Sequence, residues 1–235
     1  MPAYWEKYWN EISNDIDEQS QVGRTVKKIP VSVDVFMRTV NWAAEKMQIE
    51  KYSDVLELCC GNGAWTIPFS KRVRHVTAVD FSKPLIDVLK KKCRLENIKN
   101  IKVKLQDIST INVEDFGPYS HVLMYFALQH FSEKETIILF ENIYKILKGS
   151  MGAGCIFYIG DIPDREKLWI FANTQEYVKM YFESVKKEMP SIGTWFIKDD
   201  LIRLSEYAGF SKCEIIIQPE WQINSKYRFD MKMEV

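Results

Sequence analysis

The chain has 235 residues, enough for one sizeable α/β domain, and its 32 basic residues balance its 32 acidic ones. This balance argues against the positive field that attracts nucleic acids, and no apolar run approaches the roughly 20 residues that span a bilayer. The five cysteines are scattered without metal-ligand spacing, and no secretory signal is evident. We therefore expect a cytoplasmic protein with reduced thiols, no metal site, no nucleic-acid partner and no membrane partner.

Residues 1–33 precede the regular part of the chain. They contain an aromatic stretch, Tyr4-Trp5-Glu6-Lys7-Tyr8-Trp9, and a lone arginine, Arg24. Two interpretations stay open at this stage. The extension either folds over a ligand site or is a surface helix that buries its tryptophans.

From about Asp34 onward, short apolar runs alternate with longer amphipathic stretches. The apolar runs predict strands over 55–58, 75–79, 101–105, 120–125 and 155–160. The amphipathic stretches predict helices over 34–48, 64–73, 83–95 and 133–147, with Ser82 as a possible cap of the third. Strands separated by helices of this length imply βαβ units and a mostly parallel sheet.

Residues 164–188 interrupt this alternation with a long aromatic segment of helical spacing. A helix over 198–208 and strands over 213–218 and 227–233 follow. We expect the segment to form a helical cover over the carboxyl edge of the sheet, where open α/β sheets bind ligands. Its aromatic residues could line a lid or simply pack the added helices together: Trp169, Phe171, Tyr177, Tyr181, Phe182 and Trp195.

The strongest motif is Asp54-Val-Leu-Glu-Leu-Cys-Cys-Gly-Asn-Gly-Ala-Trp65, an apolar strand that leads into a glycine turn and then a helix. Gly61 and Gly63 permit a tight turn and a close approach of ligand to backbone. Glu57 can accept hydrogen bonds from an ammonium group or order the turn. A dinucleotide fingerprint is disfavoured, because its third glycine would stand where this chain has Thr66.

Asp80 ends the next predicted strand, His-Val-Thr-Ala-Val-Asp80-Phe-Ser. A carboxylate at this distance from the glycine turn can accept hydrogen bonds from both hydroxyls of a ribose. The alternative is an aspartate that only caps the following helix.

These two segments resemble successive motifs of the class I S-adenosylmethionine-dependent methyltransferases, in the branch that acts on small molecules. Gln106-Asp107-Ile108 and Tyr125-Phe126-Ala-Leu-Gln-His130-Phe131 extend the resemblance over roughly residues 55–160. It implies an α/β, three-layer Rossmann-like fold with a seven-stranded, mostly parallel sheet of order 3-2-1-4-5-7-6, strand 7 antiparallel, and helical lid insertions. One domain, 1–235, would comprise a lid extension (1–33), a donor-binding core (34–162), an inserted cover (163–196) and a carboxyl-terminal part (197–235).

The resemblance implies S-adenosylmethionine as the methyl donor and S-adenosylhomocysteine as the product. It implies that the adenine amino group meets Asp107, the purine face Ile108, and the methionine portion Tyr125 and Phe126. Arg24 could hold the carboxylate of the donor. The remaining residues expected at the donor are Trp9, Glu57, Cys59, Gly61, Asn62, Gly63, Asp80 and Phe81.

One position departs from the family pattern, because Cys59 stands where the family usually has glycine. This departure favours the alternative of a protein that binds the donor without catalysis.

Methyl transfer is an in-line displacement, and a base near neutral pKa can also assist an oxygen or cationic nitrogen nucleophile. His130 and Asp161 follow the fourth and fifth predicted strands and are the candidate catalytic residues. Each has an alternative: His130 could only pack against the next helix, and Asp161 could be a turn residue before a proline.

The acceptor class follows mainly from motifs that the chain lacks. It has neither the Asn/Asp-Pro-Pro-Tyr/Phe tetrad nor a Pro-Cys nucleophile after the fourth strand. We therefore expect methyl transfer to an oxygen or nitrogen of a small metabolite, such as a sugar, an amine or a biosynthetic intermediate. The alternative enzyme is an RNA or protein methyltransferase. The expected assembly is a monomer or homodimer whose partner is the small-molecule methyl acceptor.

Overall fold

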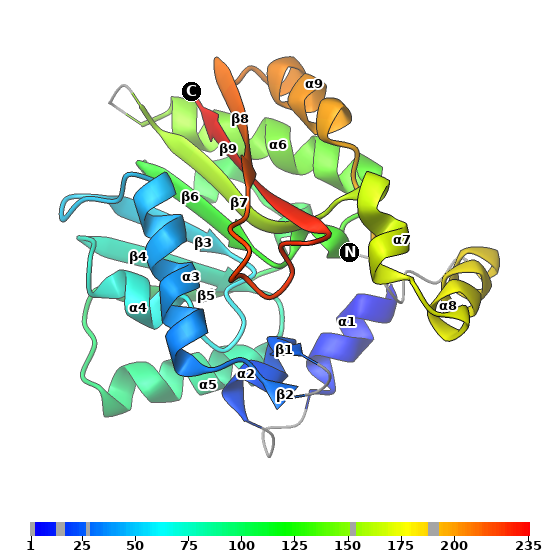
Figure 1. The fold of residues 1–235 in the computed structure, drawn as a ribbon. Coiled ribbons are helices and arrows are strands. Elements are labelled where there is room, and N and C mark those ends of the chain that lie inside the picture. The colour runs from blue at the N-terminus through cyan, green and yellow to red at the C-terminus, as the bar shows by residue number, and fades with distance from the viewer. Residues whose placement is uncertain (1–2, 13–16, 27–28, 151–153, 188–192) are drawn as a thin grey trace.

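The computed structural model describes residues 3–12, 17–26, 29–150, 154–187 and 193–235. Its centre is a seven-stranded sheet of order β5-β4-β3-β6-β7-β9-β8 (Figure 1). The strands are β3 (Asp54–Leu58), β4 (His75–Asp80), β5 (Ile101–Leu105), β6 (His121–Tyr125), β7 (Ile156–Pro163), β8 (Lys212–Ile217) and β9 (Arg228–Glu234).

The pairing of these strands confirms the expected fold. The first five strands, β3 to β7, run parallel to one another, whereas β9 runs antiparallel to both β7 and β8. Numbered within the sheet, the order is 3-2-1-4-5-7-6 with strand 7 antiparallel. The carboxyl ends of the parallel strands therefore meet at one edge, where this type of sheet binds ligands.

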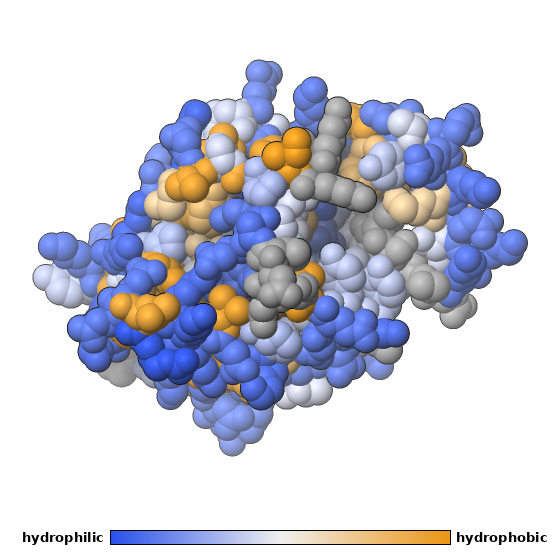
Figure 2. All heavy atoms as spheres, turned by 90° about the horizontal axis from the view of Figure 1, so that it is seen from below, coloured by the Kyte–Doolittle hydropathy of each residue, from blue (hydrophilic) through white to orange (hydrophobic). Residues whose placement is uncertain are grey.

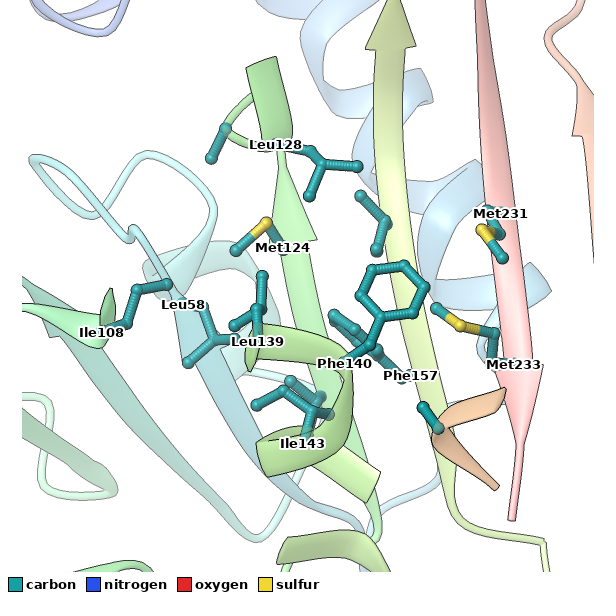
Figure 3. Packing of buried hydrophobic residues seen from close by; sticks show 14 of the residues in the cluster. Leu58, Ile108, Met124, Leu128, Leu139, Phe140, Ile143, Phe157, Met231 and Met233 are labelled. Atoms are coloured by element: carbon teal, nitrogen blue, oxygen red, sulfur yellow. The ribbon is translucent and has the colours of Figure 1, made fainter. Parts of the chain in front are cut away.

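The period-two alternation of the central strands separates two hydrophobic layers. Leu58, Met124 and Phe157 pack on one face, where α6 (Glu133–Lys148) and α9 (Lys198–Ala208) cover the sheet. Figure 3 shows Leu139, Phe140 and Ile143 of α6 packed against this face. Burying a side chain of this size contributes about 2 kcal/mol to stability, so the sheet is firmly held from this side.

The opposite face packs against three other helices. These are α3 (Val33–Lys46), α4 (Thr66–Ser70) and α5 (Lys83–Leu95), and they bury residues such as Val40, Phe69 and Leu89. Helices on both faces of a mostly parallel sheet give the three expected layers.

The N-terminal extension lies over the carboxyl edge of the sheet. It comprises α1 (Ala3–Asn10), α2 (Glu18–Gln21) and a short hairpin, β1 (Thr25–Val26) and β2 (Ile29–Pro30). Asn62 Nδ2 donates to the carbonyl of Glu18 at 2.9 Å, and Ser82 Oγ donates to the carbonyl of Trp9 at 2.7 Å. Figure 2 shows this side of the molecule, where hydrophilic side chains surround several separate apolar groups.

Several predicted elements are resolved in more detail by the structure. The helical segment expected over 164–188 consists of three pieces: a short 3-10 turn, η4 (Arg165–Lys167), leads into α7 (Leu168–Phe171), and α8 (Gln175–Lys186) follows. The break occurs because the Thr174 hydroxyl accepts from the backbone N–H of Tyr177 and so caps a new helix. Residues 188–192 of the expected cover lie outside the described residues.

Other boundaries differ for local reasons. The helix expected over 64–73 is shorter: α4 begins at Thr66, after the turn in which Gly63 N–H donates to the carbonyl of Cys60, and ends at Ser70. Ser82 precedes α5, but its hydroxyl binds the Trp9 carbonyl and does not cap the helix. Strand β7 continues to Pro163, because its last residues pair with β9 beyond the predicted end.

Gly63 offers a test of the packing beside the turn. Its φ is +81°, and a Cβ at this position would lie 2.3 Å from Leu89 Cδ1. We expect Gly63→Ala to lower the free energy of unfolding by about 2–3 kcal/mol, because both the backbone and the packing would be strained. Urea unfolding measures this loss. The control is Gly117→Ala, whose Cβ would meet nothing within 4 Å; equal stability of the two variants would contradict the packing described.

Candidate active site

The glycine turn after β3 is held by a buried carboxylate. Asp80 Oδ2 accepts a hydrogen bond from Gly61 N–H at 2.9 Å, and Oδ1 accepts one from Ser82 N–H at 2.8 Å. Burial raises the pKa of Asp80 to about 6, while the backbone hydrogen bonds favour its charged form. The carboxylate therefore joins the turn after β3 to the turn after β4 and keeps lone pairs free for further donors.

A cavity lies where these turns meet the N-terminal extension. It encloses about 670 Å³ of atom-free space, part of which is open to solvent. Its walls come from the extension, the ends of β3, β4 and β6, and the turns that follow these strands. The lining residues are Trp9, Val22, Arg24, Glu57, Cys59, Cys60, Gly61, Ala64, Trp65, Asp80, Phe81, Leu85, Tyr125, Phe126, Ala127 and His130.

Three lining side chains are more than nine-tenths buried and each retains an unsatisfied polar atom. Glu57 Oε2, Arg24 Nε and His130 Nδ1 have no hydrogen-bond partner among the described residues. Buried polar atoms without partners are costly, so their concentration around one cavity indicates a polar ligand. The wall offers an acid, a guanidinium and an imidazole to such a ligand.

The ionisation of these groups is set chiefly by burial. Burial and the nearby Asp80 raise the pKa of Glu57 to about 8, so its carboxyl group is largely protonated at pH 7. Burial and the charge of Arg228 lower the pKa of His130 to about 3, so its imidazole is neutral. Burial also raises the pKa of the Cys59 and Cys60 thiols well above the usual range.

Arg24 reaches across the site to the end of β7. Its Nη1 lies 2.7 Å from Asp161 Oδ2, in an ion pair whose side chains are 3% and 2% exposed. Asp161 Oδ2 also accepts from Asn224 Nδ2 at 3.0 Å, and Oδ1 accepts from Gln218 Nε2 at 3.3 Å. Removing one member of a buried pair costs about 3–5 kcal/mol, so this contact fixes Arg24 beside the cavity.

The structure brings together most of the residues that the sequence analysis proposed. Of the candidate set, the residues that line the cavity are Trp9, Arg24, Glu57, Cys59, Gly61, Asp80, Phe81, Tyr125, Phe126 and His130.

The other candidates lie outside the cavity lining. Asn62 is buried and donates to Glu18 and Gln21 of the extension, and Gly63 packs against Leu89. Asp107 caps η1 (Ile108–Thr110) by accepting from Ser109 N–H, and Ile108 points into the core shown in Figure 3. Asp161 forms the ion pair with Arg24. The contacts expected of these residues stay predictions.

Some lining residues were not anticipated. Trp65 stacks on Tyr125 with ring centres 3.9 Å apart, and its position directly after the glycine turn could have signalled this role. The remaining ones, Val22, Cys60, Ala64, Leu85 and Ala127, carry no distinguishing signal in the sequence. The aromatic residues of the inserted segment are not in the lining. Instead they pack on one another, as Trp169 does on Tyr181 and Phe182.

Two features are absent from the described residues. Within 3–12, 17–26, 29–150, 154–187 and 193–235, no group of three or more histidine, cysteine, aspartate or glutamate side chains is placed to hold a metal ion. In the same ranges, no helix has the length and apolar character that crossing a bilayer requires.

The sequence is similar to those of known methyltransferases. Residues 55–150 match the sequence family described as "Methyltransferase domain". The chain is similar to a demethylmenaquinone methyltransferase of Staphylococcus carnosus, with 25% identity over 84% of this chain and 88% of the relative. A tRNA/tmRNA (uracil-C(5))-methyltransferase of Campylobacter concisus shares 30% identity, over 47% of this chain and 36% of the relative.

A solved structure has the same fold. Magnesium protoporphyrin IX methyltransferase of Synechocystis, crystallised with S-adenosylhomocysteine, aligns with a TM-score of 0.61 and 14% identity over 99% of this chain and 94% of that one. The fold is thus that of the class I methyltransferases, and the family match and the relative support an S-adenosylmethionine-dependent methyltransferase. The cavity suits this donor chemically, because Asp80, Glu57 and Arg24 can meet hydroxyl, ammonium and carboxylate groups respectively.

The raised pKa of Glu57 makes donor binding depend on pH. At pH 7 Glu57 is mostly protonated, whereas Asp80, with a pKa of about 6, is mostly ionised. A ligand ammonium group favours the carboxylate form of Glu57, so binding should release a proton, and donor affinity should fall as pH drops from about 8 to 6. Calorimetric titration with S-adenosylmethionine in two buffers of different ionisation enthalpy measures the proton release.

Two variants make this measurement specific. Glu57→Gln should abolish most of the proton release and weaken binding, whereas Glu114→Gln, an exposed acid, should behave as the wild type. Proton release of the same size in Glu57→Gln would show that another group titrates.

Proposed function

We propose that this methyltransferase transfers a methyl group to an oxygen or nitrogen of a small metabolite. The observation that carries the proposal is the cavity at the carboxyl edge of the sheet, because the N-terminal extension covers it and polar groups line its wall. A covered site of this kind suits a small acceptor better than a macromolecular one.

Within this proposal, each donor-binding residue has a distinct role. Asp80 accepts hydrogen bonds from the ribose hydroxyls, and Glu57 accepts from the ammonium group. Arg24 donates to the carboxylate through the atoms that its pair with Asp161 leaves free. Tyr125, stacked on Trp65, and Phe126 contact the methionine portion.

The bound donor supplies an activated methyl group on a sulfonium. In the transfer, a lone pair of the acceptor forms the new bond to the methyl carbon while the carbon–sulfur bond breaks and its electron pair stays on sulfur. The protein's contribution is alignment and exclusion of water. Trp9 and Phe126 provide apolar walls, and the neutral His130 provides a hydrogen-bonding imidazole.

The two candidate catalytic residues fit different tasks. His130 lines the cavity, but with a pKa of about 3 its imidazole is too weak a base to take a proton at neutral pH. We therefore assign it to orienting the acceptor by hydrogen bonding. Asp161 is occupied by Arg24, Asn224 and Gln218, and we assign it to holding Arg24. An acceptor proton then passes to solvent through the part of the cavity that is open to it.

The net charge of the chain and the two relatives distinguish the possible acceptors. The Staphylococcus carnosus relative, named for demethylmenaquinone, supports a quinone-like acceptor over a macromolecular one and is matched over most of its length. The tRNA/tmRNA relative supports the RNA alternative, but the chain spans only 36% of it. The balance of 32 basic and 32 acidic residues also disfavours RNA. We propose a monomer or homodimer in either case.

Cys59 decides between an enzyme and a donor-binding protein without catalysis. Its φ of +56° is a left-handed conformation, which favours glycine and costs other residues about 1 kcal/mol or more. We expect Cys59→Gly to stabilise the protein and to bind S-adenosylmethionine at least as tightly as the wild type, with no gain in methyl transfer.

The assay follows labelled methyl groups from S-adenosylmethionine into pools of small hydroxylated aromatics, amines and sugars, and in parallel into bulk tRNA. The proposal expects label in a small-molecule pool and stoichiometric S-adenosylhomocysteine. Label only in tRNA would support the RNA alternative. Activity that appears only in Cys59→Gly would mean that the natural chain is the non-catalytic binder.

A further inference from the structure

Arg228, the first residue of β9, lies just behind the cavity wall and connects two segments that are distant in the sequence. Its Nη1 donates to the backbone carbonyl of Asp161 at 2.6 Å, and its Nη2 donates to Gln129 Oε1 at 2.6 Å. The residue is 8% exposed and is not part of the cavity lining. A buried guanidinium with two directed hydrogen bonds is a costly feature that a purely structural strand residue does not need.

Gln129 belongs to η3 (Leu128–His130), the short turn that carries the cavity-lining imidazole. Its backbone carbonyl accepts from Thr194 N–H at 2.8 Å, and its Nε2 donates to the carbonyl of Phe126 at 3.4 Å. Arg228 therefore holds the turn of His130 through the side chain of the preceding residue.

The other end of the bridge is an irregularity in β7. The pairing of β7 with β9 shifts register between Ile159 and Ile162, and Asp161 within this bulge has a φ of +62°. The Arg228 guanidinium also lies 4.8 Å from the centre of the Phe126 ring, and Phe126 has a φ of +58°. Two non-glycine residues in this conformation each cost about 1 kcal/mol or more and persist only where their surroundings hold them.

We infer that Arg228 is a positioning residue for the acceptor side of this methyltransferase: it joins the bulge at Asp161 to the turn of His130 and to Phe126. The inference rests on the proposed function, which places the acceptor beside His130. Arginine suits this role because its planar fork directs two N–H groups to separate acceptors, which the single ammonium of lysine does less well.

The charge of Arg228 supports the same role. It contributes, after burial, to the low pKa of His130 and so helps to keep the imidazole neutral. The rings of Trp5 and Trp9 pack edge-on against His130, with centroids 4.2 and 5.5 Å away, and leave it little contact with water. Arg228 thus acts on His130 in two separable ways, through the bridge to Gln129 and through its charge.

Three variants separate these effects. Arg228→Lys keeps the charge and weakens the bridge, Arg228→Met removes both, and Gln129→Met removes the bridge from its other end while Arg228 stays. Arg203→Met, at an exposed site on α9, is the matched control. Two measurements need no acceptor: hydrogen exchange of the segment 126–131, and NMR titration of histidine-labelled protein.

We expect hydrogen exchange of the segment to accelerate at least tenfold in all three site variants and to stay unchanged in the control. The pKa of His130 should rise by one unit or more in Arg228→Met, but by much less in Gln129→Met and Arg228→Lys. The dissociation constant of S-adenosylmethionine should change less than threefold in Gln129→Met, because the side chains of Asp80 and Arg24 bond to other partners, Gly61, Ser82 and Asp161.

Unchanged exchange in Gln129→Met and Arg228→Lys would overturn the inference, and so would faster exchange throughout the chain with an equal loss of donor affinity. Absence of methyl transfer to any acceptor, with these two measurements as expected, would instead count against the proposed function. With an acceptor in hand, both Arg228 variants should lose turnover at least tenfold at saturating donor.

Discussion

The site depends on one buried carboxylate. Asp80 receives the backbone N–H of Gly61 from one turn and that of Ser82 from the next, and so fixes the ends of β3 and β4 relative to each other. The N-terminal extension rests on both turns, because Ser82 donates to the carbonyl of Trp9 and Asn62 donates to the carbonyl of Glu18. The cavity, its cover and the orientation of Asp80 itself follow from this arrangement.

A second constraint is backbone strain at the same edge of the sheet. Cys59 after β3, Phe126 after β6 and Asp161 within β7 are non-glycine residues with φ between +56° and +62°. Such conformations are costly and cluster where a structure aims side chains at a ligand. Here the neighbours hold them: Arg24 and Arg228 bind Asp161, and their guanidinium groups lie 5.5 and 4.8 Å from the centre of the Phe126 ring.

The sequence predicted the sheet well, because short apolar runs such as Val55–Leu58 and the glycine turn that follows this run are local signals. It also located Glu57, Asp80 and His130 at the cavity. It could not show that Arg24 pairs with Asp161 or that Arg228 supports Gln129, because these contacts join residues far apart in the chain. Helical spacing over 164–188 does not show where one helix ends and the next begins, which the Thr174 cap decides. Of the two roles that the sequence left open for the aromatic residues of this segment, mutual packing is the one that Trp169 and Tyr181 show.

The most direct test of this account is the affinity for S-adenosylmethionine of the wild type, Asp80→Asn and Asp87→Asn, measured by calorimetry beside thermal unfolding. Asp87 is an exposed acid on α5, paired with Lys83, so its replacement should leave binding unchanged. Loss of the Asp80 charge should weaken binding by about 2–3 kcal/mol, as expected for hydrogen bonds to a charged group, in a protein that is still folded. Equal affinity of the folded Asp80→Asn variant and the wild type would contradict the central claim that this carboxylate organises the donor site.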